Sequence, residues 1–272
     1  MSQFAYSQTF HALLKEAQFT KERLGTGATQ IRLATYASKG VYFQAFTSLS
    51  TGLERVGKLS IMIDYHADHG KFPDSKYMSK EIGHKLIDIH QRLIAIISKR
   101  GLTGEFLTEL SDPIHRAILT VLSNFAVGDR YSNINLLVNN PHQNDPMALW
   151  FDKVDMPLFE SKVSAAKKNR IRQNAQIVDA MAGQISFVLH TSETNEMITT
   201  TEDASFRTGM YKSVAPYRQL FVLQIIRFWT QVLSALFYEL RTSLDLPHFS
   251  EIFAMFYKDD SYFRTRKTWE GL

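Results

Sequence analysis

The segment from Phe43 to His90 constrains the fold more than any other part of the chain. It reads as two helices facing each other across Gly70-Lys-Phe-Pro73, because glycine often ends a helix and proline cannot continue one. Three charged residues, Glu54, Arg55 and Lys58, stand inside the otherwise apolar first helix. Burying such groups costs free energy unless they pair with each other or with a partner. We therefore expect the clues to function to lie near this triplet.

Apolar residues recur at helical spacing along most of the chain, and strand-like alternation is scarce. We expect an irregular segment over 128–157 and an exposed loop over 190–207. Helices are expected at residues 10–24, from about 29 to 67, from Ser79 to Gly101, from Asp112-Pro113 onward, and at 158–189, 211–244 and 248–257.

This pattern predicts an all-α protein of about seven or eight helices. The first part forms an up-and-down helical bundle, because short loops keep neighbouring helices antiparallel. Residues 1–145 would contain this bundle. Residues 146–272 would be a helical extension packed on it, either as a separate domain or as one continuous domain.

The composition limits the chemistry. The chain has 272 residues and no cysteine, which excludes disulfides, cysteine-ligated zinc and a thiol nucleophile. The N-terminus lacks a basic start followed by an apolar run, so we expect a cytoplasmic protein. The net charge of +4 and the pI of about 9.1 permit contact with nucleic acid without requiring it.

The most apolar segment, 221–240, contains Gln224, Arg227, Gln231 and Glu239. These residues would be costly in lipid, so we predict a buried core helix and no membrane. The chain has no phosphate-binding glycine loop, Gly-x-Ser-x-Gly elbow or dinucleotide fingerprint. We expect no cofactor and, because His66 and His69 have no third ligand at a suitable spacing, no metal.

The helix pair resembles the HEPN superfamily of small helical bundles found in prokaryotic toxin, defence and RNA-processing proteins. The resemblance covers about residues 28–140. It rests on Glu54-Arg-Val-Gly-Lys58, on the Gly-Lys-Phe-Pro turn and on Gly83-His84-Lys-Leu86. It implies a metal-independent ribonuclease, working as a homodimer in stress or anti-phage defence. In such an enzyme an arginine stabilises charge on the phosphate and a nearby histidine moves the 2′-hydroxyl proton.

The sequence departs from the family pattern at the catalytic pair. Arg130 and Asn133 occupy the expected place, but the next histidine, His142, is twelve residues beyond Arg130. Arg241 and His248 have six residues between them, which fits the family spacing, but Pro247 breaks the helix and the pair lies outside the resembling region. His84, His142 and His248 are therefore alternative candidates for the base.

Two interpretations of Glu54 and Lys58 stay open. Their four-residue spacing predicts an intrahelical salt bridge that neutralises a half-buried spot. Alternatively, they orient Arg130 from the neighbouring helix. His84, near a helix start, is either a buried or capping residue or the missing base.

Basic residues gather in two further places. One is a helix with Lys162, Lys167, Lys168, Arg170 and Arg172, which is either a solvated face or a phosphate-binding surface. The other is a C-terminal tail that mixes basic and aromatic groups, as surfaces that stack on single strands do, although it could equally pack on a partner subunit. The tail contains Tyr262, Phe263, Arg264, Arg266, Lys267 and Trp269.

The sequence therefore supports two functional hypotheses. In the first, a HEPN-like ribonuclease uses Arg130 and Asn133, with Glu54 and Lys58 behind them. In the second, the bundle has no catalytic activity and binds a protein partner or nucleic acid. The first hypothesis requires Arg130 to lie close to Glu54 and Lys58.

Overall fold

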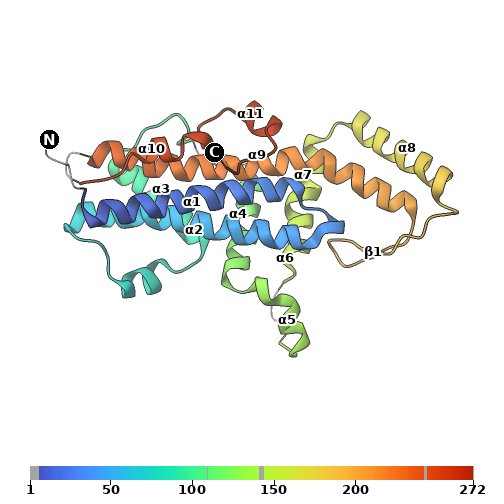
Figure 1. Ribbon diagram of the computed structural model, residues 1–272, viewed down its shortest axis with the longest axis horizontal. Helices are drawn as coiled ribbons and strands as arrows, with labels where there is room; N and C mark the ends of the chain where they lie inside the picture. Colours follow the sequence, from blue (N-terminus) through green and yellow to red (C-terminus); the bar gives the residue numbers. More distant parts are fainter. Residues whose placement is uncertain (1–5, 109, 141–143, 242–243, 272) are drawn as a thin grey trace.

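The computed structural model describes residues 6–108, 110–140, 144–241 and 244–271. Within these ranges the chain forms eleven α-helices, several short 3₁₀ and π-helical turns, and one hairpin of two-residue strands. The predicted all-α helical bundle is confirmed (Figure 1).

Three long helices lie side by side along the length of the molecule: α1 (Gln8–Leu33), α2 (Lys39–His69) and α9 (Thr201–Leu240) (Figure 1). Two shorter helices, α3 (Leu86–Arg100) and α4 (Pro113–Val127), pack on α2. The remaining elements are α5 (Ser132–Leu137), α6 (Pro146–Trp150), α7 (Met156–Lys162), α8 (Ala165–Ala182), β1 (His190–Thr191), β2 (Met197–Ile198), α10 (Phe249–Ile252) and α11 (Asp260–Thr265).

Glycines hold α1 and α2 in close contact. A Cβ atom on Gly27 would lie 2.6 Å from Leu49 Cγ, and one on Gly52 would lie 2.7 Å from Leu24 Cδ2. The predicted end of the first helix at Gly25–Gly27 is therefore wrong, because these glycines serve close packing inside a continuous helix. The prediction that Gly52 is a packing residue is confirmed.

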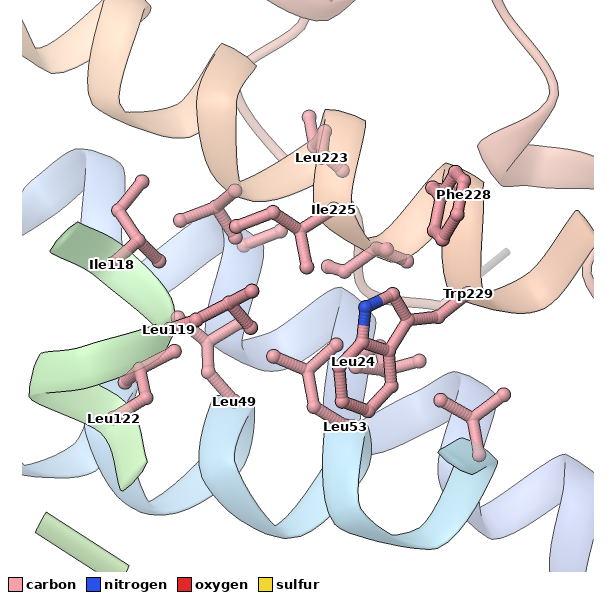
Figure 2. Packing of buried hydrophobic residues seen from close by; sticks show 14 of the residues in the cluster. Leu24, Leu49, Leu53, Ile118, Leu119, Leu122, Leu223, Ile225, Phe228 and Trp229 are labelled. Carbon is pink, nitrogen blue, oxygen red and sulfur yellow. The ribbon is translucent and has the colours of Figure 1, made fainter. Parts of the chain in front are cut away.

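The core lies where α9 covers the other long helices. Leu24, Leu49 and Leu53 face Trp229 from α1 and α2, and α4 contributes a row of aliphatic side chains (Figure 2). This hydrophobic cluster draws residues from both sides of residue 145, and α9 packs on α1 and α2 as well as on α7 and α8.

Helix α9 is long and apolar enough to span a membrane by length and composition, but 78% of its most apolar window is buried against the rest of the chain. Such burial is typical of the central helix of a bundle, as the sequence predicts.

Several helix boundaries differ from the predictions. The chain leaves the helix at Ala34 and re-enters it at Lys39, and Ser79 lies in a π-helical turn before α3 instead of capping that helix. Helix α9 begins at Thr201, so residues 201–207 are not a loop; the Thr200 side chain accepts a hydrogen bond from Asp203 N and caps the helix. The predicted signals at Gly70, Gly101 and Asp112-Pro113 are confirmed.

A buried arginine joins four segments at the centre of the fold. Arg218 of α9 is fully buried, and its Nη1 donates to Asp155 Oδ2 at 3.0 Å and to Tyr42 Oη at 2.9 Å. Its Nη2 donates to the Ala34 carbonyl, where α1 ends. Trp150 Nε1 donates to the other oxygen of Asp155 at 3.0 Å. A buried charge with this many partners is tolerated because each polar contact offsets the loss of water.

Glu193, in the loop between β1 and β2, is a second buried charge with weaker partners. Its residue is 2% exposed, and Arg207 Nη1 lies 3.7 Å from its Oε2, which has no hydrogen-bond partner among the described residues. Burial raises the pKa of Glu193, and the nearby charge of Asp155 adds to this effect.

We predict that Gly57→Ala lowers the free energy of unfolding by about 1–3 kcal/mol, because overpacking a tight core forces side chains apart. Its Cβ would lie 2.3 Å from Ile89 Cγ2 and 2.8 Å from Trp229 Cζ3. Gly40→Ala on the same helix is the matched control, since nothing lies within 4 Å of its Cβ position. Urea unfolding of both variants measures the difference, and equal stabilities would contradict this account of α2 packing.

We predict that Glu193→Gln makes the protein more stable than the parent at pH 7. A carboxyl whose folded pKa is raised binds its proton more tightly in the folded state, so stability falls as pH rises above the ordinary glutamate pKa of about 4.3. The advantage of the glutamine variant should therefore shrink toward pH 4.

Glu196→Gln is the control for this pH series, since Glu196 also faces Arg207 but its side chain is 71% exposed. Denaturant unfolding between pH 4 and pH 7 measures both variants. A Glu193→Gln protein that is less stable than the parent at pH 7 would show that the contact with Arg207 outweighs the cost of burial.

Candidate functional site

Glu54 forms a charged cluster with Lys58 and His84 midway along α2. Lys58 Nζ lies 2.7 Å from Glu54 Oε1, and His84 Nδ1 lies 2.9 Å from the same oxygen. The two α2 side chains are about one-fifth exposed, whereas that of His84 is 65% exposed. His84 follows Gly83, whose φ of +64° is a conformation that glycine adopts at little cost. The predicted intrahelical salt bridge is therefore present, with His84 on its outer side.

An apolar groove of about 540 Å³ lies beside this cluster, between α1, α2 and the turn after α2. Lys58 lines the groove, and Arg55 forms an ion pair there with Glu16 at 2.7 Å. The rest of the lining is mostly apolar and includes Leu13, Leu59, Met62, Phe72 and Met78. The groove can take an apolar group, but its charged side chains neutralise one another.

Arg130 and Asn133 line a different and smaller pocket of about 200 Å³ after the end of α4. Arg130 is exposed, and its guanidinium stacks on Tyr131 with 4.9 Å between the Cζ atom and the ring centroid. Asp129 lies in the same pocket, and burial raises the pKa of its carboxyl.

The structure does not bring Arg130 together with Glu54 and Lys58. The Arg130 pocket touches α2 only between Lys39 and Phe46. Glu54 lies eight residues beyond Phe46, which is about 12 Å further along the helix axis at 1.5 Å per residue. The interpretation in which Glu54 and Lys58 orient Arg130 is therefore wrong.

The candidate histidines also lie apart from Arg130. His84 bonds to Glu54, and His248 packs on Phe237 with ring centroids 4.6 Å apart. Arg241 stacks on Tyr238, beyond the end of α9. His142 lies outside the described residues. Among the described residues that line the Arg130 pocket there is no histidine.

The predicted long basic helix is divided in two. Helix α7 ends at Lys162, and α8 begins after Ser164, whose side chain accepts a hydrogen bond from Lys167 N. Lys168 Nζ lies 2.6 Å from Glu160 Oε2, so its charge is paired.

The other basic residues of α8 face two clefts against α9. Lys167 and Arg170 line one groove together with Lys212, and Arg172 lines the next cleft along. The sequence interpretation missed the α9 side of both clefts because it placed the start of that helix at Tyr211. Thr200 followed by Glu202 and Asp203 is the N-terminal helix signal that was available.

The C-terminal tail packs on its own chain. Trp269 is 1% exposed and Phe263 is fully buried, so neither offers a free ring face to a base. Trp269 N donates to Thr29 Oγ1 at 2.8 Å, and the Trp269 carbonyl lies where a Cβ on Gly25 would be. The basic residues Arg264 and Lys267 stay exposed, and Arg266 is half-buried. The predicted stacking surface is therefore a core contact.

The acidic residues near His66 and His69 are engaged by cations. Asp64 Oδ2 lies 2.9 Å from Lys99 Nζ, and Asp68 Oδ1 lies 2.7 Å from Arg100 Nη2. The hydrogen bond from Lys99 lowers the pKa of Asp68. In the part of the chain that the structure describes, no three His, Asp or Glu residues gather as a metal site.

One histidine in a cleft was not singled out from the sequence. His115 of α4 shares a cleft of about 400 Å³ with Lys162 and Arg264. It is 7% exposed, its Nε2 lies 2.8 Å from Gln224 Oε1, and burial lowers its pKa. This position on the apolar side of α4, with one ring nitrogen held by an amide, is typical of a structural histidine.

Comparisons with protein-family models, with curated proteins and with solved structures found no match. The resemblance to the HEPN superfamily therefore stays a prediction.

We predict that Glu54→Gln and Arg130→Ala have additive effects on the free energy of unfolding, within about 0.5 kcal/mol, because distant sites without shared partners do not couple. The matched cycle of Glu54→Gln with Lys58→Met should show a coupling of about 0.3–1 kcal/mol, as expected for a half-exposed pair. Denaturant unfolding of the single and double variants provides both values. Coupling between Glu54 and Arg130 that equals the Glu54–Lys58 value would refute their separation.

Proposed function

We propose that the protein is a non-catalytic helical interaction module that binds a protein partner. One observation carries this proposal: Arg130 and the Glu54–Lys58–His84 cluster occupy different parts of α2. General acid–base cleavage of RNA needs a base within hydrogen-bond reach of the reacting proton, beside the group that stabilises the phosphate.

The surface supports a binding role. On α5 and the residue after it, Ile134, Leu136, Leu137 and Val138 are 59–83% exposed. Contiguous apolar side chains on a protein surface are typical of sites that bind another macromolecule. We include a homodimer in this proposal, because the projecting helix α5 (Figure 1) offers an apolar surface to a second copy of the chain. We also propose that the protein works in the cytoplasm.

A second apolar surface lies at the far end of α8. Met181, Ile185 and Phe187 are 79%, 87% and 88% exposed, at the end of the molecule where α8 meets the hairpin (Figure 1). Hydrophobic groups left in water cost free energy that a partner would recover. This second surface therefore also favours binding over chemistry.

We predict that the purified protein cleaves single-stranded RNA no faster than its Arg130→Ala and His84→Ala variants, with or without a metal chelator. Gel analysis of labelled RNA measures cleavage, and a solution mass measurement gives the oligomeric state. Arg116→Ala, which removes an exposed arginine of α4, is the control.

Cleavage by the parent protein that falls at least tenfold in Arg130→Ala, and not in Arg116→Ala, would overturn the proposal. The HEPN-like ribonuclease would then be the function, with its base yet to be identified. Loss of cleavage in the His84 variant as well would identify that base.

A further inference from the structure

The groove between α8 and α9 has an unusual balance of charge. It has a volume of about 470 Å³, and the cations Lys167, Arg170 and Lys212 line it. No carboxylate lines it among the described residues. A cleft lined by one sign of charge attracts ligands of the opposite sign.

These cations are available to a ligand. Nearby basic residues are already engaged, since Lys168 pairs with Glu160 and Arg207 pairs with Asp203. In the described part of the chain, the Lys167, Arg170 and Lys212 side chains form no ion pair within 4.0 Å, and all three residues are exposed. Their charges therefore keep their full attraction for an anion, screened only by solvent and salt.

The floor of the groove is set by a glycine. Gly209 of α9 lies against Ile171 of α8, and a Cβ on Gly209 would lie 2.6 Å from Ile171 Cγ2. The two helices approach closely at this point, and the groove opens above it. Glycine at a helix crossing of this kind lets the backbones come close enough to form a continuous wall.

The rest of the groove is apolar. Ile177 and Val178 line it and are 57% and 40% exposed. The apolar side chains continue along α8 to Met181, which is 79% exposed. A ligand that fits this surface carries negative charge at one end and an apolar side chain at the other.

We propose that this groove binds a segment of a partner protein that carries acidic residues next to an aliphatic or aromatic side chain. The carboxylates would meet Arg170 and Lys212, and the apolar side chain would cover Ile177 and Val178. This inference rests on the proposed function, because it names the partner chemistry of an interaction module. Peptides that place an apolar face in a helix groove commonly bind in this way.

A peptide fits the groove better than single-stranded RNA. Bases bind proteins largely by stacking on aromatic rings, and the side chains beside the cations here are aliphatic. The aromatic residue predicted to stack, Trp269, is buried in the core. Carboxylates and apolar side chains together match both halves of the groove.

Selection from a random peptide library on the full chain tests this proposal. We expect the enriched peptides to combine acidic and apolar residues, and a labelled copy to bind the parent at least tenfold more tightly than the Arg170→Gln/Lys212→Gln variant by fluorescence anisotropy. Arg172→Gln is the matched control, because Arg172 lies on the same helix but lines the neighbouring cleft. It should bind within twofold of the parent.

Two results would overturn the groove assignment. One is enrichment of peptides without acidic residues, or of acidic peptides that bind the double variant as tightly as the parent. The other is a single-stranded RNA 20-mer that displaces the peptide and itself loses affinity in the double variant, which would identify a nucleic-acid site. The interaction module would survive the first result, whereas arginine-dependent RNA cleavage would overturn the module itself. Unchanged thermal melting of each variant shows that the fold is intact.

Discussion

The guanidinium of Arg218 sets the register of the long helices. It is enclosed in the core and satisfied only when the end of α1, Tyr42 of α2 and Asp155 are all in place around it. Apolar stripes alone allow long helices to slide by a turn with little loss, because Leu and Ile side chains are nearly interchangeable in a core. A buried charge with fixed partners removes that freedom, since any slip leaves it unpaired. The grooves on the surface inherit their shape from this alignment.

The length of α2 explains why the fold separates groups that a smaller bundle would bring together. The helix has 31 residues, about 46 Å at 1.5 Å per residue. Arg130 meets it near its start, whereas Glu54 and His84 meet each other midway along it. Each region is built well enough to bind something, but they are too far apart to act on one bond. A long bundle of this kind therefore supports several contact surfaces more readily than one catalytic centre.

The sequence predicted what local chemistry decides. Asp112 before Pro113 and Gly101 after α3 mark helix ends by their own conformational preferences, and Glu54 meets Lys58 because of helix geometry alone. It failed where distant segments decide. Gly25 reads as a stop signal until the tail is known to pack against it, and Trp269 reads as a surface aromatic until the same contact is known. The position of Arg130 relative to α2 is likewise a property of packing, which no local pattern encodes.

The contact between Thr29 and Trp269 joins residues 240 positions apart. On a ribosome that adds about 5–20 residues per second, α1 would wait on the order of tens of seconds before the segment that covers this part of it has been made. During that time the apolar side of the first helix has only its nearest neighbours for shelter. Protection of the nascent chain is therefore a requirement built into the topology, set by how late in synthesis the last piece of the core arrives.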